Sequence, residues 1–202
     1  MDFDLSEEQT MLKDGLDRML ANEYAFEDRN RHMAEPEGYS QAMWARYAEM
    51  GLMMLPFAEA DGGLGGGAED IMLVMESFGR ALVLEPWFAT VVLGGGFLRE
   101  GGSEAQRGEL VPALAEGSLK LAFAHTERHA RYDLAHVETT ATKQGGSYIL
   151  NGAKSIVLNG DTADKVFVSA RVSGGVRDED GLCVFLVDAD ADGLSRNARK
   201  IA

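Results

Sequence analysis

Cysteine and basic residues are scarce in this sequence. Its 202 residues include a single cysteine, Cys183, so the chain can form no disulfide within itself. Sparse cysteine is typical of reducing compartments, and we expect a cytoplasmic protein. Lysine and arginine number 19 against 33 aspartates and glutamates, which leaves a net charge of −14. This balance argues against nucleic acid or an anionic membrane as a general partner, because both attract basic surfaces. One anionic ligand in a locally positive pocket stays possible.

Long apolar runs are also missing. No stretch approaches the roughly 18 apolar residues of a membrane-spanning helix, so we predict no membrane span. The start, MDFDLSEEQ, has no basic segment followed by an apolar one, which indicates no signal peptide. With 46% hydrophobic and 26% charged residues, the composition is that of a globular protein that can bury a core without disulfides or metals.

The first half of the chain has the period of helices. Apolar residues recur three or four positions apart, in three stripes. Their members are Leu12, Leu16, Met19 and Leu20, then Tyr39, Met43, Tyr47 and Met50, then Ile71, Met75, Phe78 and Leu82. Ser6 with Gln9 and Ser103 with Gln106 form S-x-x-Q sequences, which predict helix starts. The glycine-rich residues 61–67 lack the G-K-[ST] ending of a phosphate loop and are interpreted as a link between helices.

Near residue 118 the period changes to two, which indicates strands. Candidate strands are residues 119–125, 137–143, 147–152, 154–160, 163–172 and 182–189. Glycine-containing turn signals separate them: Gln144-Gly145-Gly146, Asn151-Gly152, Asn159-Gly160 and Gly174-Gly175. Helices followed by hairpin-linked strands predict the α+β class. We expect an all-α domain at residues 1–117 and a mostly antiparallel β domain at residues 118–202.

The stretch FAHTERHARYD, residues 123–133, concentrates positive and titratable side chains in this acidic chain. His125, Arg128, His129 and Arg131 lie around Glu127. Guanidinium groups suit phosphate and pyrophosphate, so a site for an anionic ligand is one interpretation. A solvated loop that pairs with acidic neighbours is another. A metal site is not favoured, because the two histidines have no carboxylate at ligand spacing.

Four segments in order give the chain a family resemblance. LSEEQ at the start, GLMMLPFAEADGGLG at 51–65, AFAHTE at 122–127 and LNGAKSIVLNGDTAD at 150–164 resemble the acyl-CoA dehydrogenase family of flavoproteins. Within it, the chain looks most like the small subunit of pimeloyl-CoA dehydrogenase-type heteromers. The resemblance implies a helical domain, a middle β-barrel cut short at residue 202, and a C-terminal four-helix domain outside this sequence. The family's proton-abstracting glutamate belongs to that third domain, so the resemblance implies no catalytic residue here and no activity of these residues alone.

The resemblance also implies FAD as cofactor and a set of residues that would hold it. The set is Phe123, His125, Thr126, Arg131, Tyr132, Ile156 and Leu158. Two departures from the family pattern fall inside it. Arg131-Tyr132 stand where the family has Gly-Ser, and Ile156-Val157-Leu158 stand where it has W-I-T. Leu158 therefore replaces a threonine that donates to the flavin, and leucine has no donor.

These departures leave two interpretations open. In one, Arg131 replaces the lost donors and binds a pyrophosphate of FAD or CoA. In the other, Arg131 and Tyr132 fill the pocket and the subunit holds little flavin.

The function implied for the parent enzyme is oxidation of an acyl-CoA to a trans-2-enoyl-CoA, as in fatty acid β-oxidation, with an electron-transfer flavoprotein as electron acceptor. The rival is a flavin-poor, non-catalytic subunit that completes a heteromeric acyl-CoA dehydrogenase. A plain protein-interaction module is a third possibility. We expect a homo-oligomer or a hetero-oligomer with a homologous large subunit.

Overall fold

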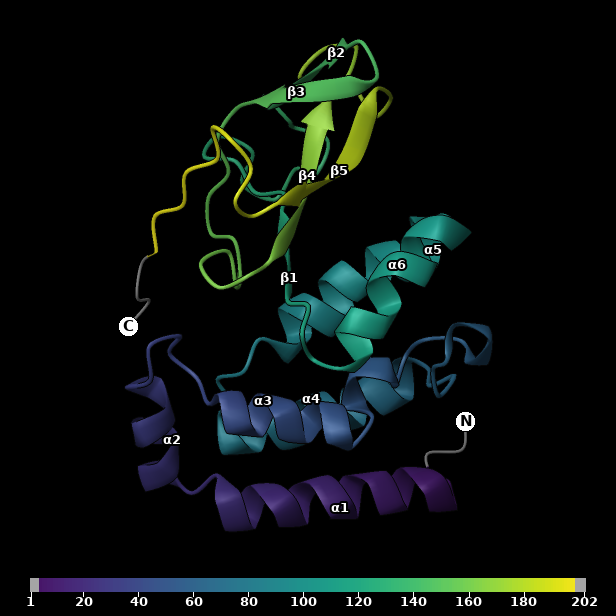
Figure 1. Cartoon of the computed structure of the whole chain (residues 1–202), viewed down its shortest axis with the longest axis vertical. Coiled ribbons are helices and arrows are strands. Elements are labelled where there is room, and N and C mark those ends of the chain that lie inside the picture. The colour runs from purple at the N-terminus through teal and green to yellow at the C-terminus, as the bar shows by residue number, and fades with distance from the viewer. Residues whose placement is uncertain (1–3, 199–202) are drawn as a thin grey trace.

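Helices fill the first half of the chain and strands the second in the computed structural model, which describes residues 4–198. In Figure 1 the helices form the lower and middle parts of the molecule and the strands the upper part. The helices are α1 (Glu7–Glu23), α2 (Phe26–Met33), α3 (Gln41–Glu49), α4 (Ala68–Ala81), α5 (Gly95–Gly101) and α6 (Glu104–Ala115), with the short turns η1 (Leu52–Met54) and η2 (Glu59–Asp61) and the π-helix η3 (Phe88–Gly94). The predicted class, helices followed by a sheet, is confirmed.

Both predicted capping boxes start helices. The Ser6 hydroxyl accepts from Gln9 N at 3.1 Å, and Gln9 Oε1 accepts from Ser6 N at 3.1 Å. Ser103 and Gln106 repeat this exchange at the start of α6. Each pair satisfies two backbone N–H groups that would otherwise lack partners within the helix.

The helices bury their stripes in one large core. The first two predicted stripes are confirmed, since their members are buried or pack against the core. The third stripe is wrong at Leu82, whose side chain is 56% exposed. Leu82 caps α4 in a left-handed conformation, with φ of 54°, so its side chain leaves the helical face. The ring of Phe78 packs instead between Tyr47, at 4.9 Å, and Trp87, at 5.6 Å.

The second half forms one five-stranded sheet that is mixed and open. Its strands are β1 (Leu121–Ala124), β2 (Thr140–Gln144), β3 (Ser147–Asn151), β4 (Lys165–Arg171) and β5 (Leu182–Asp188). β2 pairs with β3, and β4 with β5, in antiparallel ladders as predicted. β1 runs parallel to β4, and among the described residues the sheet does not close into the expected barrel. A parallel pair needs a long connection, and here β2, β3 and their flanking loops supply it.

The predicted strand at residues 154–160 is wrong, because this segment is a loop of turns. Ile156 and Asn159 have positive φ angles of 54° and 58°, which a strand cannot contain. The side-chain amide of Asn159 donates to Leu121 O at 3.2 Å. The apolar alternation of Ile156 and Leu158 therefore mimics a strand pattern within a loop that is fixed by contact with β1.

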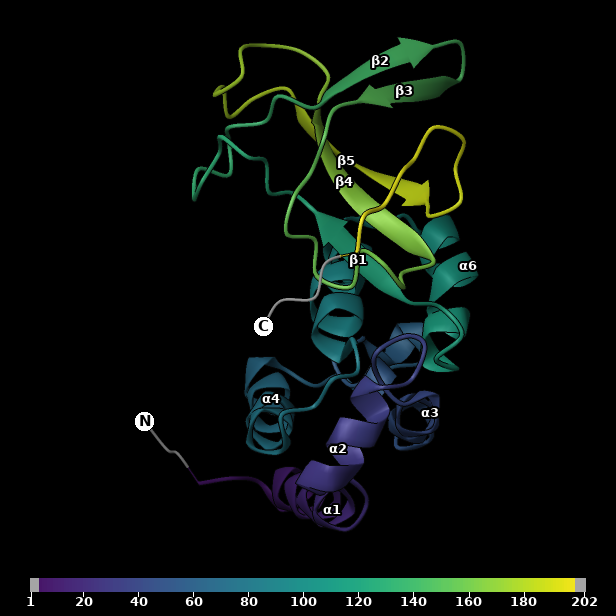
Figure 2. The same cartoon turned by 90° about the vertical axis from the view of Figure 1, so that its left-hand side faces the viewer.

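The π-helix η3 fixes β1 against the helical half. The Thr90 hydroxyl lies 3.2 Å from Leu121 N and 3.4 Å from Leu121 O, and Thr90 is fully buried. A side chain at Gly94 would meet Leu121, because an added Cβ would lie 2.4 Å from the Cβ of that residue. Figure 2 shows β1 running directly over this helical segment. The start of β1, and hence the site at its end, is positioned by the helices.

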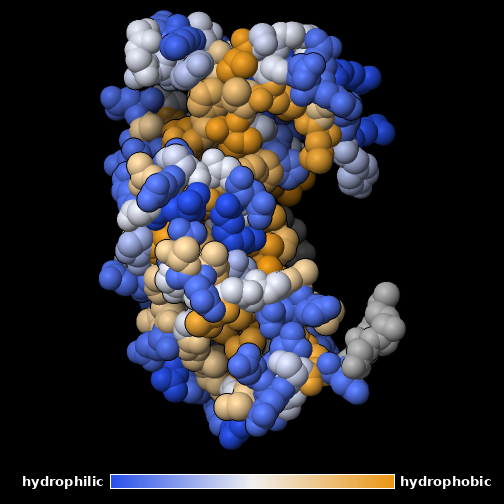
Figure 3. Space-filling view, turned by 90° about the vertical axis from the view of Figure 1, so that its right-hand side faces the viewer, coloured by the Kyte–Doolittle hydropathy of each residue, from blue (hydrophilic) through white to orange (hydrophobic). Residues whose placement is uncertain are grey.

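Apolar side chains also reach the surface of the sheet (Figure 3). Tyr148, Ile149 and Val184 are each more than 40% exposed, and the Tyr148 ring lies 5.0 Å from that of Phe185. The described residues leave these side chains uncovered. None of the helices formed by residues 4–198 combines the length and the apolar character needed to cross a membrane.

We predict that Thr90→Val destabilises the protein by about 1–3 kcal/mol, because it leaves the buried N–H of Leu121 without its partner. The matched control is Thr10→Val, which removes an exposed hydroxyl bonded to Ser6 O and should change stability by less than about 0.5 kcal/mol. Urea unfolding of both variants measures the difference. Equal stability losses would show that the Thr90 contact does not matter.

Candidate cofactor site

The end of β1 carries three of the predicted residues in contact with one another. The rings of Phe123 and His125 stack at 4.7 Å with an interplanar angle of 25°. The Thr126 hydroxyl lies 3.4 Å from His125 Nε2. Phe97 of α5 packs edge-on against Phe123 at 4.5 Å and holds it from the helical side. All three predicted residues are partly exposed, so they form a surface that a flat ligand can reach.

His125 is held in its neutral form. Burial lowers the pKa of its imidazole, and the nearby Lys154 ammonium lowers it further. A neutral imidazole offers one donor and one acceptor. His125 can therefore exchange hydrogen bonds with a ligand without adding charge.

The loop between β3 and β4 brings the second predicted segment to the same place. Ser155 N donates to Thr126 O at 2.9 Å, which joins this loop to the end of β1. Ile156 and Leu158 follow in that loop, with 75% and 49% of their surfaces exposed. A β-branched residue at positive φ is strained, and such strain persists where the surroundings enforce it. Ile156 is thus held in an unfavourable conformation next to the β1 residues.

Tyr132 of the Arg131-Tyr132 pair borders a hollow that the other six predicted residues do not line. Tyr132 is fully exposed and borders an open hollow of about 490 Å³, together with Leu134 and Glu179. Neither Ile156 nor Leu158 lines this hollow. Arg131 has a φ of 51°, the left-handed region that glycine adopts most readily. The structure therefore does not bring all seven predicted residues into one cavity.

Arg171 fixes residues 135–137, which follow the loop that contains Arg131 and Tyr132; this loop, residues 125–133, is called the basic loop below. Its buried guanidinium donates to the backbone oxygens of Ala135 at 2.8 Å, Val137 at 3.2 Å and Val176 at 3.0 Å. Guanidinium carries five N–H donors, so one side chain can satisfy several carbonyls. The chain that follows the basic loop is therefore held to β4 by hydrogen bonds.

Sequence reasoning missed an ion pair beneath the site. Lys154 Nζ lies 2.7 Å from Glu127 Oε1, and the two side chains are only 8% and 4% exposed. Glu127 also accepts from Glu138 N at 2.6 Å, Thr139 N at 3.0 Å and the Thr139 hydroxyl at 2.5 Å. The partners are 27 residues apart, and no periodic pattern connects them. The one available signal was that both fall inside the segments that carry the family resemblance.

The pKa of each member of the ion pair lies below its ordinary value, for different reasons. Burial alone would raise the pKa of Glu127, but the hydrogen bonds from Lys154, Thr139 and Glu138 outweigh it and hold the pKa at about 2. Burial lowers the pKa of Lys154, and the Glu127 carboxylate opposes that change. At neutral pH Glu127 is therefore fully ionised.

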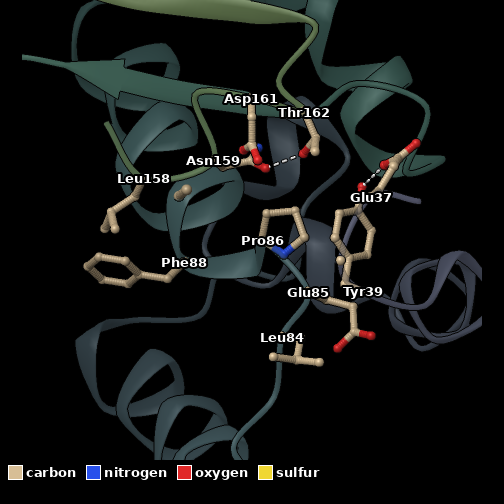
Figure 4. A pocket seen from close by; sticks show the side chains of 12 residues that line it. Glu37, Tyr39, Leu84, Glu85, Pro86, Phe88, Leu158, Asn159, Asp161 and Thr162 are labelled. Atoms are coloured by element: carbon tan, nitrogen blue, oxygen red, sulfur yellow. Dashed lines mark hydrogen bonds between the residues drawn. The ribbon is translucent and has the colours of Figure 1, made fainter. Parts of the chain in front are cut away.

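A cavity of about 290 Å³ lies beside Leu158, between the helices and the sheet (Figure 4). Three segments line it: Glu37, Gly38 and Tyr39; Leu84, Glu85, Pro86, Phe88 and Ala89; and Leu158, Asn159, Asp161 and Thr162. Leu158 and Phe88 face each other on one side in Figure 4. The cavity thus combines an apolar side with polar groups on the other.

Glu85 is the most buried acid of this cavity. Its carboxylate accepts from Ser40 N at 3.1 Å and from the hydroxyls of Tyr24, at 3.0 Å, and Tyr47, at 3.3 Å. Burial raises the pKa of Glu85 against these donors. Because its donors come from the helical core, Glu85 ties the cavity wall to that core.

Two family models match almost the whole chain. The N-terminal domain of acyl-CoA dehydrogenase matches residues 6–118, and the middle domain of acyl-CoA dehydrogenase matches residues 122–201. The chain belongs to the acyl-CoA dehydrogenase family. The predicted domain division between residues 117 and 118, and the finer resemblance to pimeloyl-CoA dehydrogenase-type subunits, stay predictions.

Known relatives are similar to this chain over about half of their own length. The probable acyl-CoA dehydrogenase YngJ of Bacillus subtilis is 30% identical over 200 residues, 96% of this chain and 51% of YngJ. A solved structure named "Tcur3481-Tcur3483 steroid ACAD G363A variant" is 30% identical with a TM-score of 0.82, over 94% of this chain and 50% of its own. The FAD complex of PigA is 26% identical with a TM-score of 0.83, over 96% and 51%. The chain spans about half the length of these proteins.

We predict that Glu127 makes the protein sensitive to acid. Its pKa falls from 4.5 to about 2 on folding, so its contribution is fully present above pH 4.5 and is lost as the pH falls toward 2. Between about pH 6 and pH 3, the free energy of unfolding should fall by about 2 kcal/mol more in the wild type than in Glu127→Gln.

Urea unfolding at the two pH values checks this prediction. Glu109→Gln, which changes an exposed glutamate on α6, is the control and should follow the wild type. A Glu127→Gln variant with the same pH dependence as the wild type would contradict the assignment of Glu127 as a buried, ionised partner of Lys154.

Proposed function

We propose that this chain is the flavin-holding N-terminal portion of an acyl-CoA dehydrogenase subunit. One observation carries the proposal. The two segments that resemble the family's flavin-binding segments are joined by the hydrogen bond from Ser155 N to Thr126 O, and a cavity of about 290 Å³ opens beside Leu158 of the second segment. The FAD complex of PigA, a relative of similar fold, supports the choice of cofactor.

The residues at this place fit a flavin. Phe123 and His125 offer a stacked pair of rings, which suits contact with a flat aromatic ring system. Thr126 supplies a hydroxyl, and neutral His125 supplies a donor and an acceptor. Leu158 and Ile156 supply apolar surface. FAD, when bound, would accept the hydride that leaves an acyl-CoA substrate.

The reaction and the partners follow from this proposal. The parent enzyme oxidises an acyl-CoA to a trans-2-enoyl-CoA in the cytoplasm, as a step of fatty acid β-oxidation, and passes its electrons to an electron-transfer flavoprotein. The names of its relatives as acyl-CoA dehydrogenases support the reaction class. The cavity beside Leu158 would take part of the acyl chain, because that chain must lie against the flavin for hydride transfer.

A flavin-poor partner subunit is the second candidate function. Leu158 offers no hydrogen bond, and Tyr132 lies in a hollow separate from the cavity. One related structure is named for two components together, Tcur3481 and Tcur3483, which favours an assembly with a second subunit. In such an assembly one subunit can lose its cofactor while the other keeps it.

The flavin content of four proteins distinguishes these two candidates. If Arg131 binds a pyrophosphate, Arg131→Ala should weaken FAD retention by about 1.5–3 kcal/mol, the cost of a lost charged hydrogen bond. If the site has lapsed, Arg131→Gly with Tyr132→Ser should gain flavin, and more so with Leu158→Thr added. Glycine fits the positive φ at position 131 without strain. Bound FAD per chain is measured by absorbance for the wild type and the single, double and triple variants.

Arg128→Ala is the matched control, since Arg128 is an exposed arginine of the same loop. It should leave the flavin content unchanged. A fall in Arg131→Ala supports a working site, and a rise in the triple variant supports a lapsed one. Equal flavin in all proteins would show that this loop does not touch the cofactor.

The 202 residues by themselves should show no acyl-CoA dehydrogenase turnover, because the family resemblance places the proton-abstracting carboxylate in another domain. The measurement is reduction of an artificial electron acceptor with acyl-CoA and added FAD. Flavin-dependent turnover by these residues alone would overturn the proposed division of roles between domains.

A further inference from the structure

Lys154 lies where the main segments of the sheet part meet. Its ammonium donates to Glu127 Oε1 at 2.7 Å and to the Ser169 hydroxyl of β4 at 3.0 Å, and it lies 3.4 Å from His125 O at the end of β1. Its side chain is only 8% exposed. One buried cation thus contacts strand β4 and the segment that follows β1.

Glu127 extends this connection to the chain before β2. It accepts hydrogen bonds from the backbone N–H groups of Glu138 and Thr139 and from the Thr139 hydroxyl. The carboxylate is therefore fixed from one side by these donors and from the other by Lys154. Its position does not depend on solvent, since Glu127 is 4% exposed.

The ion pair stands directly beside the contact between the two cofactor segments. Thr126 follows His125 and precedes Glu127, and Ser155 follows Lys154. The two residues joined by the hydrogen bond from Ser155 N to Thr126 O are thus each adjacent in sequence to one member of the ion pair. Any shift of Lys154 relative to Glu127 would move Ser155 relative to Thr126, and with it Ile156 relative to His125.

We propose that Lys154 is a positioning residue of the cofactor site, which sets residues 125–127 against residues 152–158 through its ion pair with Glu127. The inference rests on the proposed function, in which these two segments hold FAD. Lys154 acts on FAD affinity through the two segments and not by touching the cofactor. A purely structural ion pair would instead change FAD affinity only as far as it changes stability.

Three variants separate these roles. Lys154→Met removes the cation and leaves the Glu127 carboxylate buried without it. Glu127→Gln with Lys154→Met removes both charges and so leaves no stranded carboxylate. Lys165→Met is the matched control, because Lys165 is also a lysine of the sheet paired with an acid, Asp188, but is far more exposed.

The protein is expressed from its complete reading frame and is measured together with any subunit that copurifies with it. The measurements are the dissociation constant for FAD, the melting temperature without FAD, and hydrogen exchange in the peptide that contains Ser155. In Lys154→Met, we expect FAD binding about tenfold weaker or more and faster exchange at Ser155. In the double variant, the melting temperature should recover while FAD binding stays weak. Lys165→Met should match the wild type in FAD binding and in exchange at Ser155.

The outcomes that overturn the inference are distinct from those that overturn the proposed function. If wild type binds FAD and Lys154→Met binds it equally well, Lys154 positions nothing. If FAD affinity recovers together with the melting temperature in the double variant, the pair is only structural. If Lys154→Met fails to fold, FAD binding by the double variant decides between a positioning role and a purely structural one. If no wild-type form binds FAD, the proposed function fails, and this inference fails with it.

Discussion

The buried ion pair between Glu127 and Lys154 is the constraint on which the shape of the site depends. Removing two charges from water is costly, and an ion pair is tolerated in the interior only when further hydrogen bonds satisfy its atoms. Here the carboxylate has three further donors and the ammonium a hydroxyl acceptor. These contacts draw together the end of β1, the residues before β2 and the loop between β3 and β4, and they attach that loop to β4. The end of β1 and the loop before β4 consequently meet at one point, and the candidate cofactor residues extend from it.

The helical half contributes to the site as much as the sheet does. The main core contains Leu121 of β1 and Phe167 of β4 together with the buried residues of the helices, so the two parts share one hydrophobic interior. Thr90 of the π-helix satisfies the backbone of Leu121, and Phe97 of α5 supports the Phe123 ring. π-Helices are rare and occur frequently at functional sites. The cavity beside Leu158 exists only because this packing sets residues 84–89 opposite residues 158–162.

Residues with unfavourable backbone angles are concentrated in the basic loop and in the loop between β3 and β4. Of the four non-glycine residues with positive φ in the described part of the chain, Ile156 and Asn159 lie in the β3–β4 loop and Arg131 in the basic loop. Strain of this kind costs about 1–3 kcal/mol per residue and persists where surrounding contacts enforce it. At position 131 the family resemblance has glycine, so the chain keeps a glycine-like backbone while it carries an arginine. The architecture of the segment is retained although its hydrogen-bond donors have changed, which is why both a working and a lapsed site remain compatible with the fold.

The sequence by itself determined helices α1, α3, α4 and α6, the five strands, both capping boxes and the family, because each depends on residues close together in the chain or on their order. It failed at residues 154–160, where Ile156 and Leu158 alternate as in a strand while the contact of Asn159 with Leu121 forces a turn. It predicted a mostly antiparallel domain, whereas β1 runs parallel to β4, which lies about 40 residues further along the chain. Sequence order placed seven residues in one cofactor set. In the tertiary structure His125 contacts both Phe123 and Thr126, and the loop of Ile156 and Leu158 is joined to Thr126 through Ser155, whereas Tyr132 borders a separate hollow. Only the folded chain revealed that Glu127 meets Lys154, since partners 27 residues apart leave no periodic trace. Local patterns reflect local geometry, whereas a buried ion pair and a cavity between segments form only once distant residues have packed.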